Sequence, residues 1–239
     1  MLHPALDGAA IAVFDLDGTL VDSAADIAFS ANATIDRHRL RSMTVDEVVP
    51  LIGRPAGEIF LAAGCDDDAV DDLVVEFRAH LREHVGTYST VYPGVVDVLQ
   101  ELRGRGVRRA VATTKPTGLA TVAVERAGLL DLFDHVQGTD GVAPKPDPAI
   151  IRMCFDALGV STGTMIGDTP DDVNAGRTDL LEAAALRHGG HRLDKPLLVG
   201  VDPWGFDLRT RLGIARVSAA PPIATASDVL PRLETVARG

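Results

Sequence analysis

Four short apolar runs without polar alternation set the frame for this chain: residues 9–15, 107–113, 163–168 and 197–202. Such runs are typical of parallel strands that are buried on both faces of a sheet. Helical spacing of apolar residues lies between the runs, which gives an alternation of strand and helix. This alternation predicts an α/β fold with a Rossmann-like parallel sheet core and right-handed crossovers.

Polar residues stand where three of these runs end. They are Asp15, Thr113 and Asp168, and each is followed by a turn-rich segment. Because ligands of open parallel sheets bind at the carboxyl ends of the strands, the three side chains predict a site at that edge.

The stretch from 22 to 91 breaks the alternation. It contains helical patterns and no convincing strand, with helices expected at 22–39, 44–51, 55–63 and 69–85. Tyr92-Pro93-Gly94 then marks the return to the sheet pattern. We therefore expect a core domain of residues 1–21 and 92–239, and an inserted helical cap domain of residues 22–91 over the strand ends.

The charge balance excludes several classes of partner. Lys and Arg number 23 against 34 Asp and Glu, a net charge of −11, which argues against nucleic acid or an anionic membrane surface as a partner. No apolar run approaches the ~20 residues that span a bilayer, and the first residues show no basic leader typical of a secretory signal. The two cysteines, Cys65 and Cys154, form no disulfide framework, so a cytoplasmic location is expected.

The first apolar run ends in Asp15-Leu16-Asp17-Gly18-Thr19-Leu20. Helix capping explains one acidic residue at such a position, but two carboxylates at a buried strand end repel each other unless a cation or a shared proton intervenes. Oxygen ligands of this kind suit Mg²⁺, and one carboxylate can remain as a nucleophile.

Four segments, in order, resemble the motifs of haloacid-dehalogenase-like (HAD) phosphohydrolases. They are DLDGTL, Thr113 in VATTKP, Lys145 in APKPDP, and Asp168 with Asp172 in GDTPDD. The helical stretch at 22–91 is similar to the four-helix cap of that family. Its pattern, together with IGRPAGEIF, looks most like the phosphoglycolate-phosphatase branch.

The resemblance implies a role for each carboxylate. Asp15 is the expected nucleophile that forms an aspartyl-phosphate, and Asp17 the acid and base that serves the leaving oxygen and then water. Mg²⁺ is expected between Asp15, the backbone carbonyl of Asp17, and Asp168. Asp172 is either a further metal ligand or an outer contact to metal-bound water or to Lys145.

Cationic and hydroxyl groups complete the expected site. The ammonium of Lys145 and the metal reverse the negative local charge that would otherwise repel a phosphate. Thr113 is expected to donate its hydroxyl to a phosphoryl oxygen, and the backbone amide of Thr114 adds a further donor. Lys115 matches a lysine of similar family members, but a solvated loop lysine explains it equally well.

Arg54 lies between Gly53 and Pro55, where two helical segments of the expected cap meet. An arginine there can form a bidentate pair with a substrate carboxylate such as that of phosphoglycolate. It can equally be a solvated residue or pair with Glu58, four residues on.

One segment departs from the family pattern. Residues 177–196 intervene between the fourth motif and the run at 197–202, and they leave the local sheet order and the role of Lys195 open. A last helix is expected at about 227–236.

The sequence thus predicts a Mg²⁺-dependent phosphatase, a monomer or homodimer, that hydrolyses a small phosphomonoester through an aspartyl-phosphate. A phosphosugar mutase of the β-phosphoglucomutase type shares both aspartates and is the alternative enzyme. A non-catalytic phosphoprotein-binding scaffold is a third reading, but such a domain has no need of the proton shuttle that Asp17 supplies.

Overall fold

The computed structural model describes residues 9–169, 171–172 and 175, together with the backbone of strands at 197–202, 205–210 and 213–218. The chain divides into two compact units. The first combines Met1–Pro144 with Ile150–Asp168, and the second combines Lys145–Ala149 with Thr169–Gly239.

A four-stranded parallel sheet forms the centre of the first unit. Its order is β5-β4-β1-β6, with bounds β5 His135–Gln137, β4 Arg108–Ala112, β1 Ile11–Phe14 and β6 Thr164–Ile166. Phe14 lies opposite Val111 of β4 and Ile166 of β6, and all pairs are parallel. The residues that follow these strands therefore meet at one edge of the sheet. The predicted α/β fold is confirmed.

Every residue of Ile-Ala-Val-Phe in β1 is apolar and buried. Such a sequence suits a strand that is covered on both faces of the sheet. Three helices accompany the sheet: α5 Val95–Gly104, α6 Thr117–Arg126 and α7 Ala149–Leu158. Leu99 and Leu102 of α5 and Val124 of α6 are wholly buried in one hydrophobic cluster with β1 and β4. Strand β5 was not predicted, because its three residues, His-Val-Gln, form no apolar run.

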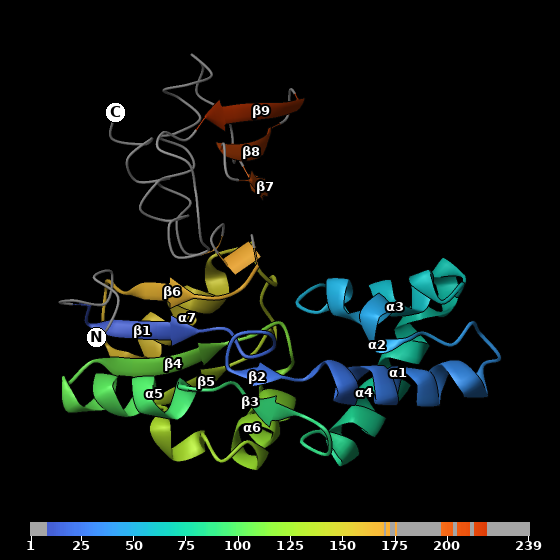
Figure 1. Cartoon of the computed structure of the whole chain (residues 1–239), viewed down its shortest axis with the longest axis horizontal. Helices are drawn as coiled ribbons and strands as arrows, with labels where there is room; N and C mark the ends of the chain where they lie inside the picture. Colours follow the sequence, from blue (N-terminus) through green and yellow to red (C-terminus); the bar gives the residue numbers. More distant parts are fainter. Residues whose placement is uncertain are drawn as a thin grey trace. The chain divides into compact units, whose positions relative to one another are not determined.

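Helices α1 Ala24–Arg37, α2 Val45–Val48, α3 Gly57–Ala62 and α4 Val70–His84 follow β1 and its turn, and we call them the helical insertion (Figure 1). The four predicted helical segments are confirmed. Thr44 and Glu47 form a reciprocal capping box at the start of α2, which fixes where that helix begins.

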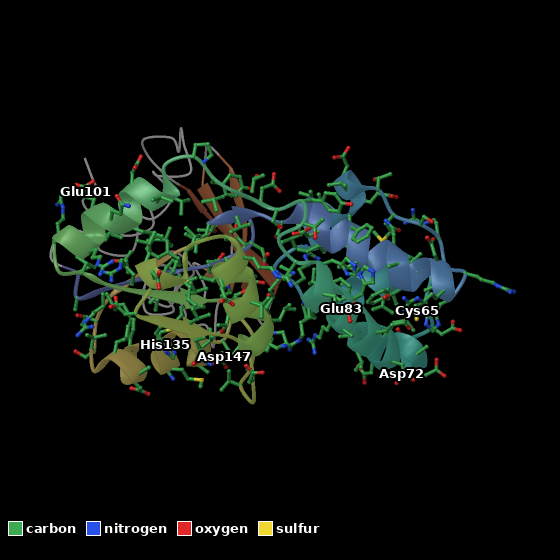
Figure 2. The ribbon with its side chains drawn as sticks, turned by 90° about the horizontal axis from the view of Figure 1, so that it is seen from below. Cys65, Asp72, Glu83, Glu101, His135 and Asp147 are labelled. Atoms are coloured by element: carbon green, nitrogen blue, oxygen red, sulfur yellow. The ribbon has the colours of Figure 1, made fainter. Side chains whose placement is uncertain are left out.

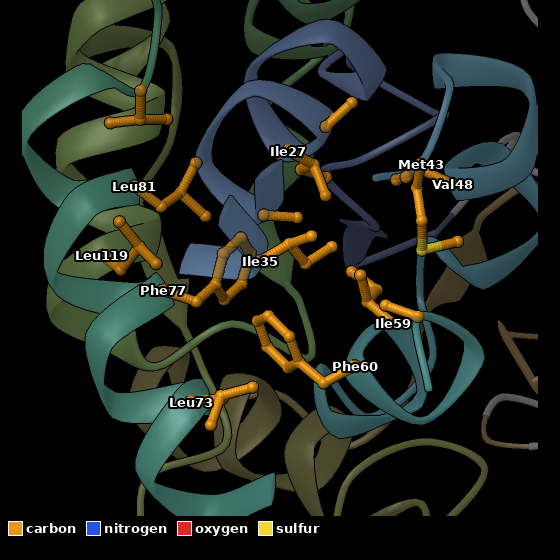
Figure 3. Close-up of a cluster of buried hydrophobic side chains, with 14 residues drawn as sticks. Ile27, Ile35, Met43, Val48, Ile59, Phe60, Leu73, Phe77, Leu81 and Leu119 are labelled. Carbon is orange, nitrogen blue, oxygen red and sulfur yellow. The ribbon is translucent and has the colours of Figure 1, made fainter. Parts of the chain in front are cut away.

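The helical insertion has a hydrophobic cluster of its own (Figure 3). Phe60 of α3 and Phe77 of α4 meet edge to face at its centre, with ring centroids 5.8 Å apart. Ile35 of α1 is wholly buried beside them, while Leu119 of α6 joins the cluster from the sheet side. The insertion is thus a packed body that contacts α6.

The two ends of the insertion are tied together. The short strands β2 Val21–Asp22 and β3 Thr90–Val91 pair antiparallel, so the expectation of no strand within 22–91 is wrong at its margins. The carboxylate of Asp26, wholly buried in α1, accepts hydrogen bonds from the backbone N–H of Gly86 at 2.7 Å and of Tyr88 at 2.8 Å. Two-residue strands give no periodic signal, which explains why the sequence did not indicate them.

The segment at 197–202 does not follow its prediction as a further parallel strand. It is β7 Leu197–Asp202, which pairs antiparallel with β8 Gly205–Thr210, and β8 pairs antiparallel with β9 Gly213–Ser218. An apolar run does not record the direction of its partner strand. The segment 177–196, with Lys195, and the helix expected at 227–236 lie outside the described residues.

Charged side chains such as Asp72 and Glu83 of α4 are exposed on the surface (Figure 2). Among the helices that the structure describes, none is long and apolar enough to cross a membrane.

Candidate active site

Asp15 and Asp17 follow β1 directly and are almost fully buried, with exposed fractions of 3% and 6%. The backbone N–H of Asp15 donates to the carbonyl of Ile166 at 2.8 Å, which extends the pairing with β6 by one residue. The chain then turns at Gly18, whose φ of 83° belongs to the left-handed region that favours glycine. Both carboxylates therefore lie at the carboxyl end of β1, before the chain turns.

Asp168, which follows β6, lies beside this turn. A β-carbon at Gly18 would lie 2.4 Å from Oδ2 of Asp168, so the lack of a side chain lets the carboxylate approach the backbone. Thr19 Oγ1 donates to Oδ1 of Asp168 at 2.9 Å. The carboxylate oxygens of Asp15 and Asp168 come within 4.8 Å of each other. Carboxylate oxygens at this spacing, beside a glycine that leaves room for them, fit a hard divalent cation such as Mg²⁺.

Asp17 has different partners. Its Oδ1 accepts a hydrogen bond of 2.5 Å from Ser23 Oγ, and its Oδ2 forms an ion pair with the ammonium of Lys115. Ser23 stands at the N-cap of α1, yet its hydroxyl makes no cap hydrogen bond. The sequence does not indicate a role for Ser23 in the site, because a serine directly before a helix is typical of an ordinary N-cap. For Lys115, the structure favours a partner in the site over a solvated side chain.

The loop after β4 brings Thr113 and Thr114 to the same edge. Thr113 is 1% exposed, and its N–H donates to the carbonyl of Gln137 at 3.1 Å. The carbonyl of Thr114 accepts from Thr139 Oγ1 at 2.9 Å. A β-carbon at Gly138 would lie 2.3 Å from the carbonyl oxygen of Lys115, so the neighbouring segment packs directly against this loop. The contacts with Gly138 and Thr139 thereby fix the position of this loop.

Lys145 and Asp172 belong to the second compact unit and pair within it. The Lys145 ammonium lies 2.5 Å from Oδ1 of Asp172, and each side chain is 2% exposed. Oδ2 of Asp172 accepts from the N–H and the hydroxyl of Thr169, at 3.1 and 2.7 Å. Of the contacts expected for Asp172, the one to Lys145 is present.

A pocket of about 480 Å³ extends from Asp17 and Lys115 to the helical insertion. Arg54 lines it, and its Nη1 lies 3.2 Å from Oε2 of Glu58, so the pair with Glu58 is present. Binding of a substrate carboxylate by Arg54 stays a prediction.

Several carboxylates at the strand ends act on the side chain of Tyr92. Burial, with the carboxylates of Asp22, Asp168 and Asp17, raises the pKa of Tyr92. Nearby negative charges make the tyrosine hydroxyl harder to deprotonate, so a raised pKa is expected beside several carboxylates. A cation bound beside Asp15 would offset the negative charge of these carboxylates.

Residues 12–185 match the family described as haloacid dehalogenase-like hydrolase. The phosphoglycolate phosphatase of Rhodospirillum rubrum is 34% identical over 193 residues, which cover 75% of this chain and 80% of that protein. The pyrophosphatase PpaX of Bacillus velezensis is 33% identical over 168 residues, which cover 69% of this chain and 77% of that protein. The crystal structure of a predicted phosphoglycolate phosphatase from Haemophilus somnus 129pt superposes with a TM-score of 0.64 at 26% identity, covering 70% of this chain and 80% of that one.

The chain therefore belongs to the haloacid dehalogenase-like hydrolases. Within that family it is an enzyme, a phosphoric monoester hydrolase.

Proposed function

We propose that the chain is a Mg²⁺-dependent phosphatase that hydrolyses a small, phosphoglycolate-like phosphomonoester through an aspartyl-phosphate. The observation that carries this proposal is the different surroundings of the two buried carboxylates. Asp15 faces Asp168, whereas Asp17 is held by Ser23 and Lys115. Neighbouring carboxylates in unlike environments are suited to unlike roles.

In the first step, an oxygen of Asp15 attacks phosphorus while the bond from phosphorus to the leaving oxygen breaks. Asp17 gives its proton to that oxygen. In the second step, Asp17 takes a proton from water as the water oxygen attacks the phosphorus of the aspartyl-phosphate, which releases inorganic phosphate and restores Asp15. Ser23 and Lys115 keep Asp17 in place for both transfers.

The hydroxyl of Thr113 and the backbone N–H of Thr114 would bind phosphoryl oxygens. Lys145 would add a positive charge to the same group, positioned by Asp172. Asp15, the carbonyl of Asp17 and Asp168 would hold Mg²⁺, with Asp172 as a further or outer contact. Bound there, the ion would neutralise charge on the phosphoryl group.

Residues 22–91 would act as the cap domain over a core of residues 1–21 and 92–239, with Arg54 available to bind a substrate carboxylate. The free thiols Cys65 and Cys154 fit a reducing cytoplasm. The partner would be a small phosphate ester, bound by a monomer or homodimer. The net charge of −11 disfavours nucleic acid and an anionic membrane surface as partners.

The test is release of inorganic phosphate from p-nitrophenyl phosphate and phosphoglycolate, with Mg²⁺ and with a chelator. We expect turnover that requires the metal and is lost in Asp15→Asn. Transfer of the phosphate to a second position on a sugar would identify a mutase instead. Binding of phosphoproteins without any turnover would identify a scaffold.

A further inference from the structure

Part of the wall of this pocket is apolar. Val74 of α4, Leu119 of α6 and Val142 of the loop after β5 contribute to it. The volume of about 480 Å³ falls in the range of roughly 300–1,000 Å³ typical of sites for ligands of drug size. Phosphoglycolate, whose only apolar group is one methylene, would leave most of this wall uncovered.

Arg78 of α4 lines the same pocket and is exposed. Across the described part of the chain, no hydrogen bond or ion pair engages its guanidinium. The two other cations of the pocket each have a carboxylate partner, since Arg54 forms an exposed pair with Glu58 and Lys115 a buried one with Asp17. Arg78 is therefore the pocket cation with its donors available.

The charges around Arg78 define what it faces. Hydrogen bonds from Thr117 and, to a smaller extent, the charge of Arg78 lower the pKa of Asp140. The guanidinium thus lies within electrostatic reach of the loop that follows β5, on the sheet side of the pocket. Asp71 of α4 is the other carboxylate at the pocket besides Asp17, and it is exposed to solvent.

We propose that Arg78 is a specificity-determining residue that binds an anionic group on the leaving part of the substrate, whose apolar body lies against Val74, Leu119 and Val142. The inference rests on the proposed phosphatase function and narrows its substrate class. The substrate is the phosphomonoester of a hydroxy acid in which an apolar segment separates the ester oxygen from a carboxylate.

The chemistry of the two ends supports this orientation. Asp17, Thr114 and Lys115 form the end of the pocket at the strand termini, where the phosphoryl group reacts. The leaving group must then extend toward the helical insertion. A guanidinium presents a planar fork of donors that matches a carboxylate.

The test uses three alkyl phosphates as probes: benzyl phosphate, para-carboxybenzyl phosphate and phosphoglycolate. We expect the wild type to favour para-carboxybenzyl phosphate over benzyl phosphate in kcat/KM by about ten- to hundredfold, the usual worth of a hydrogen bond to a charged group. We also expect it to favour para-carboxybenzyl phosphate over phosphoglycolate. In Arg78→Ala, the preference for the carboxylated benzyl ester should fall to about twofold or less, and Arg78→Lys should restore part of it.

Arg82→Ala is the matched control, because Arg82 lies one turn further along α4, is exposed and does not line the pocket. It should retain the wild-type preference. Equal losses on both benzyl esters in Arg78→Ala would overturn the inference, as would a preference for phosphoglycolate in the wild type. Failure to hydrolyse any of the three esters and p-nitrophenyl phosphate would overturn the proposed phosphatase function itself, so the two failures are distinguishable.

Discussion

Gly18 and Asp168, 150 positions apart in the sequence, approach so closely that a β-carbon on the glycine would lie 2.4 Å from the aspartate Oδ2. Both residues follow neighbouring strands, and the contact links the turn after β1 to the carboxylate after β6. The shape of the proposed metal site therefore depends on a missing side chain as well as on the acidic residues.

Gly18→Ala should displace Asp168 and raise the Mg²⁺ concentration needed for half-maximal activity by about tenfold or more, equivalent to ~1.4 kcal/mol of lost metal binding. Its backbone strain at positive φ should also cost about 1 kcal/mol of stability. Titration of activity with Mg²⁺ and chemical unfolding measure the two effects.

Gly94→Ala is the control for this variant. Gly94 has a φ of 84°, close to the 83° of Gly18, but its β-carbon would meet nothing within 4 Å. It should show the loss of stability without the change in Mg²⁺ requirement. An unchanged Mg²⁺ requirement in Gly18→Ala would argue against a metal role for Asp168.

Asp15→Asn should abolish phosphate release, because an amide cannot form an acyl phosphate. The melting temperature should stay the same or rise, since one of two close carboxylates is neutralised. Calorimetry and a phosphate assay test both parts, with Asp36→Asn, an exposed carboxylate of α1, as the control. Near-normal activity in purified Asp15→Asn would rule out the covalent mechanism.

Asp17→Asn should slow formation and hydrolysis of the aspartyl-phosphate by ~10²–10⁴-fold, the usual worth of general acid–base catalysis. Ser23→Ala should cost about tenfold through loss of the hydrogen bond that positions Asp17. In the Asp17→Asn background, Ser23→Ala should add little, because both changes act on one proton transfer. Single-turnover kinetics measures each step, and fully additive losses would separate Ser23 from the role of Asp17.

Lys145→Met should destabilise the protein by about 3–5 kcal/mol, because the buried carboxylate of Asp172 loses the opposite charge beside it. The double variant Lys145→Met with Asp172→Leu should recover much of this stability, since an apolar pair can replace a buried ion pair. It should remain inactive if Lys145 binds the phosphoryl group. Recovery of both stability and turnover in the double variant would assign the pair a structural role alone.

The two thiols should react very differently with an aromatic disulfide at mildly alkaline pH. Burial raises the pKa of Cys154 to about 12, so almost no thiolate forms, and the side chain is wholly buried. Cys65 lies on the helical insertion and is partly exposed (Figure 2). Burial, and then the charges of Asp66, Asp68 and Asp67, raise the pKa of the Cys65 thiol.

We expect one slowly reacting thiol in the native protein and two rapidly reacting thiols after unfolding. Cys65→Ser should abolish the reaction of the native protein with the disulfide. Rapid labelling of Cys154 would show that its surroundings open readily.

The sequence indicated the parts of the fold that depend on periodicity. The wholly apolar Ile-Ala-Val-Phe of β1 and the amphipathic segments of α1 and α4 were found from their patterns alone. Strand β7 was given the wrong partners, because pairing direction depends on distant residues. The pair of β2 and β3 is too short to leave a pattern in the sequence.

The same limit applies to the candidate site. The strand-end positions of Asp15, Thr113 and Asp168 follow from where apolar runs stop. The contact between Ser23 and Asp17 depends instead on the turn at Gly18, which returns the chain so that the helix start faces the carboxylate. The apolar wall beside Arg78 joins residues from three separate segments, and no local motif records it.

The carboxylate of Asp26 has a consequence for engineering. It accepts hydrogen bonds from the backbone N–H groups of Gly86, Tyr88 and Ser89. Arg126 of α6 donates to the carbonyls of Glu83 and Val85 at the end of α4. The two connections of the insertion are therefore joined into one attachment. Exchange of the helical insertion between relatives should succeed when the transplanted segment includes both Asp26 and residues 86–89. A cut between them would leave a buried carboxylate on one side and unpaired amides on the other.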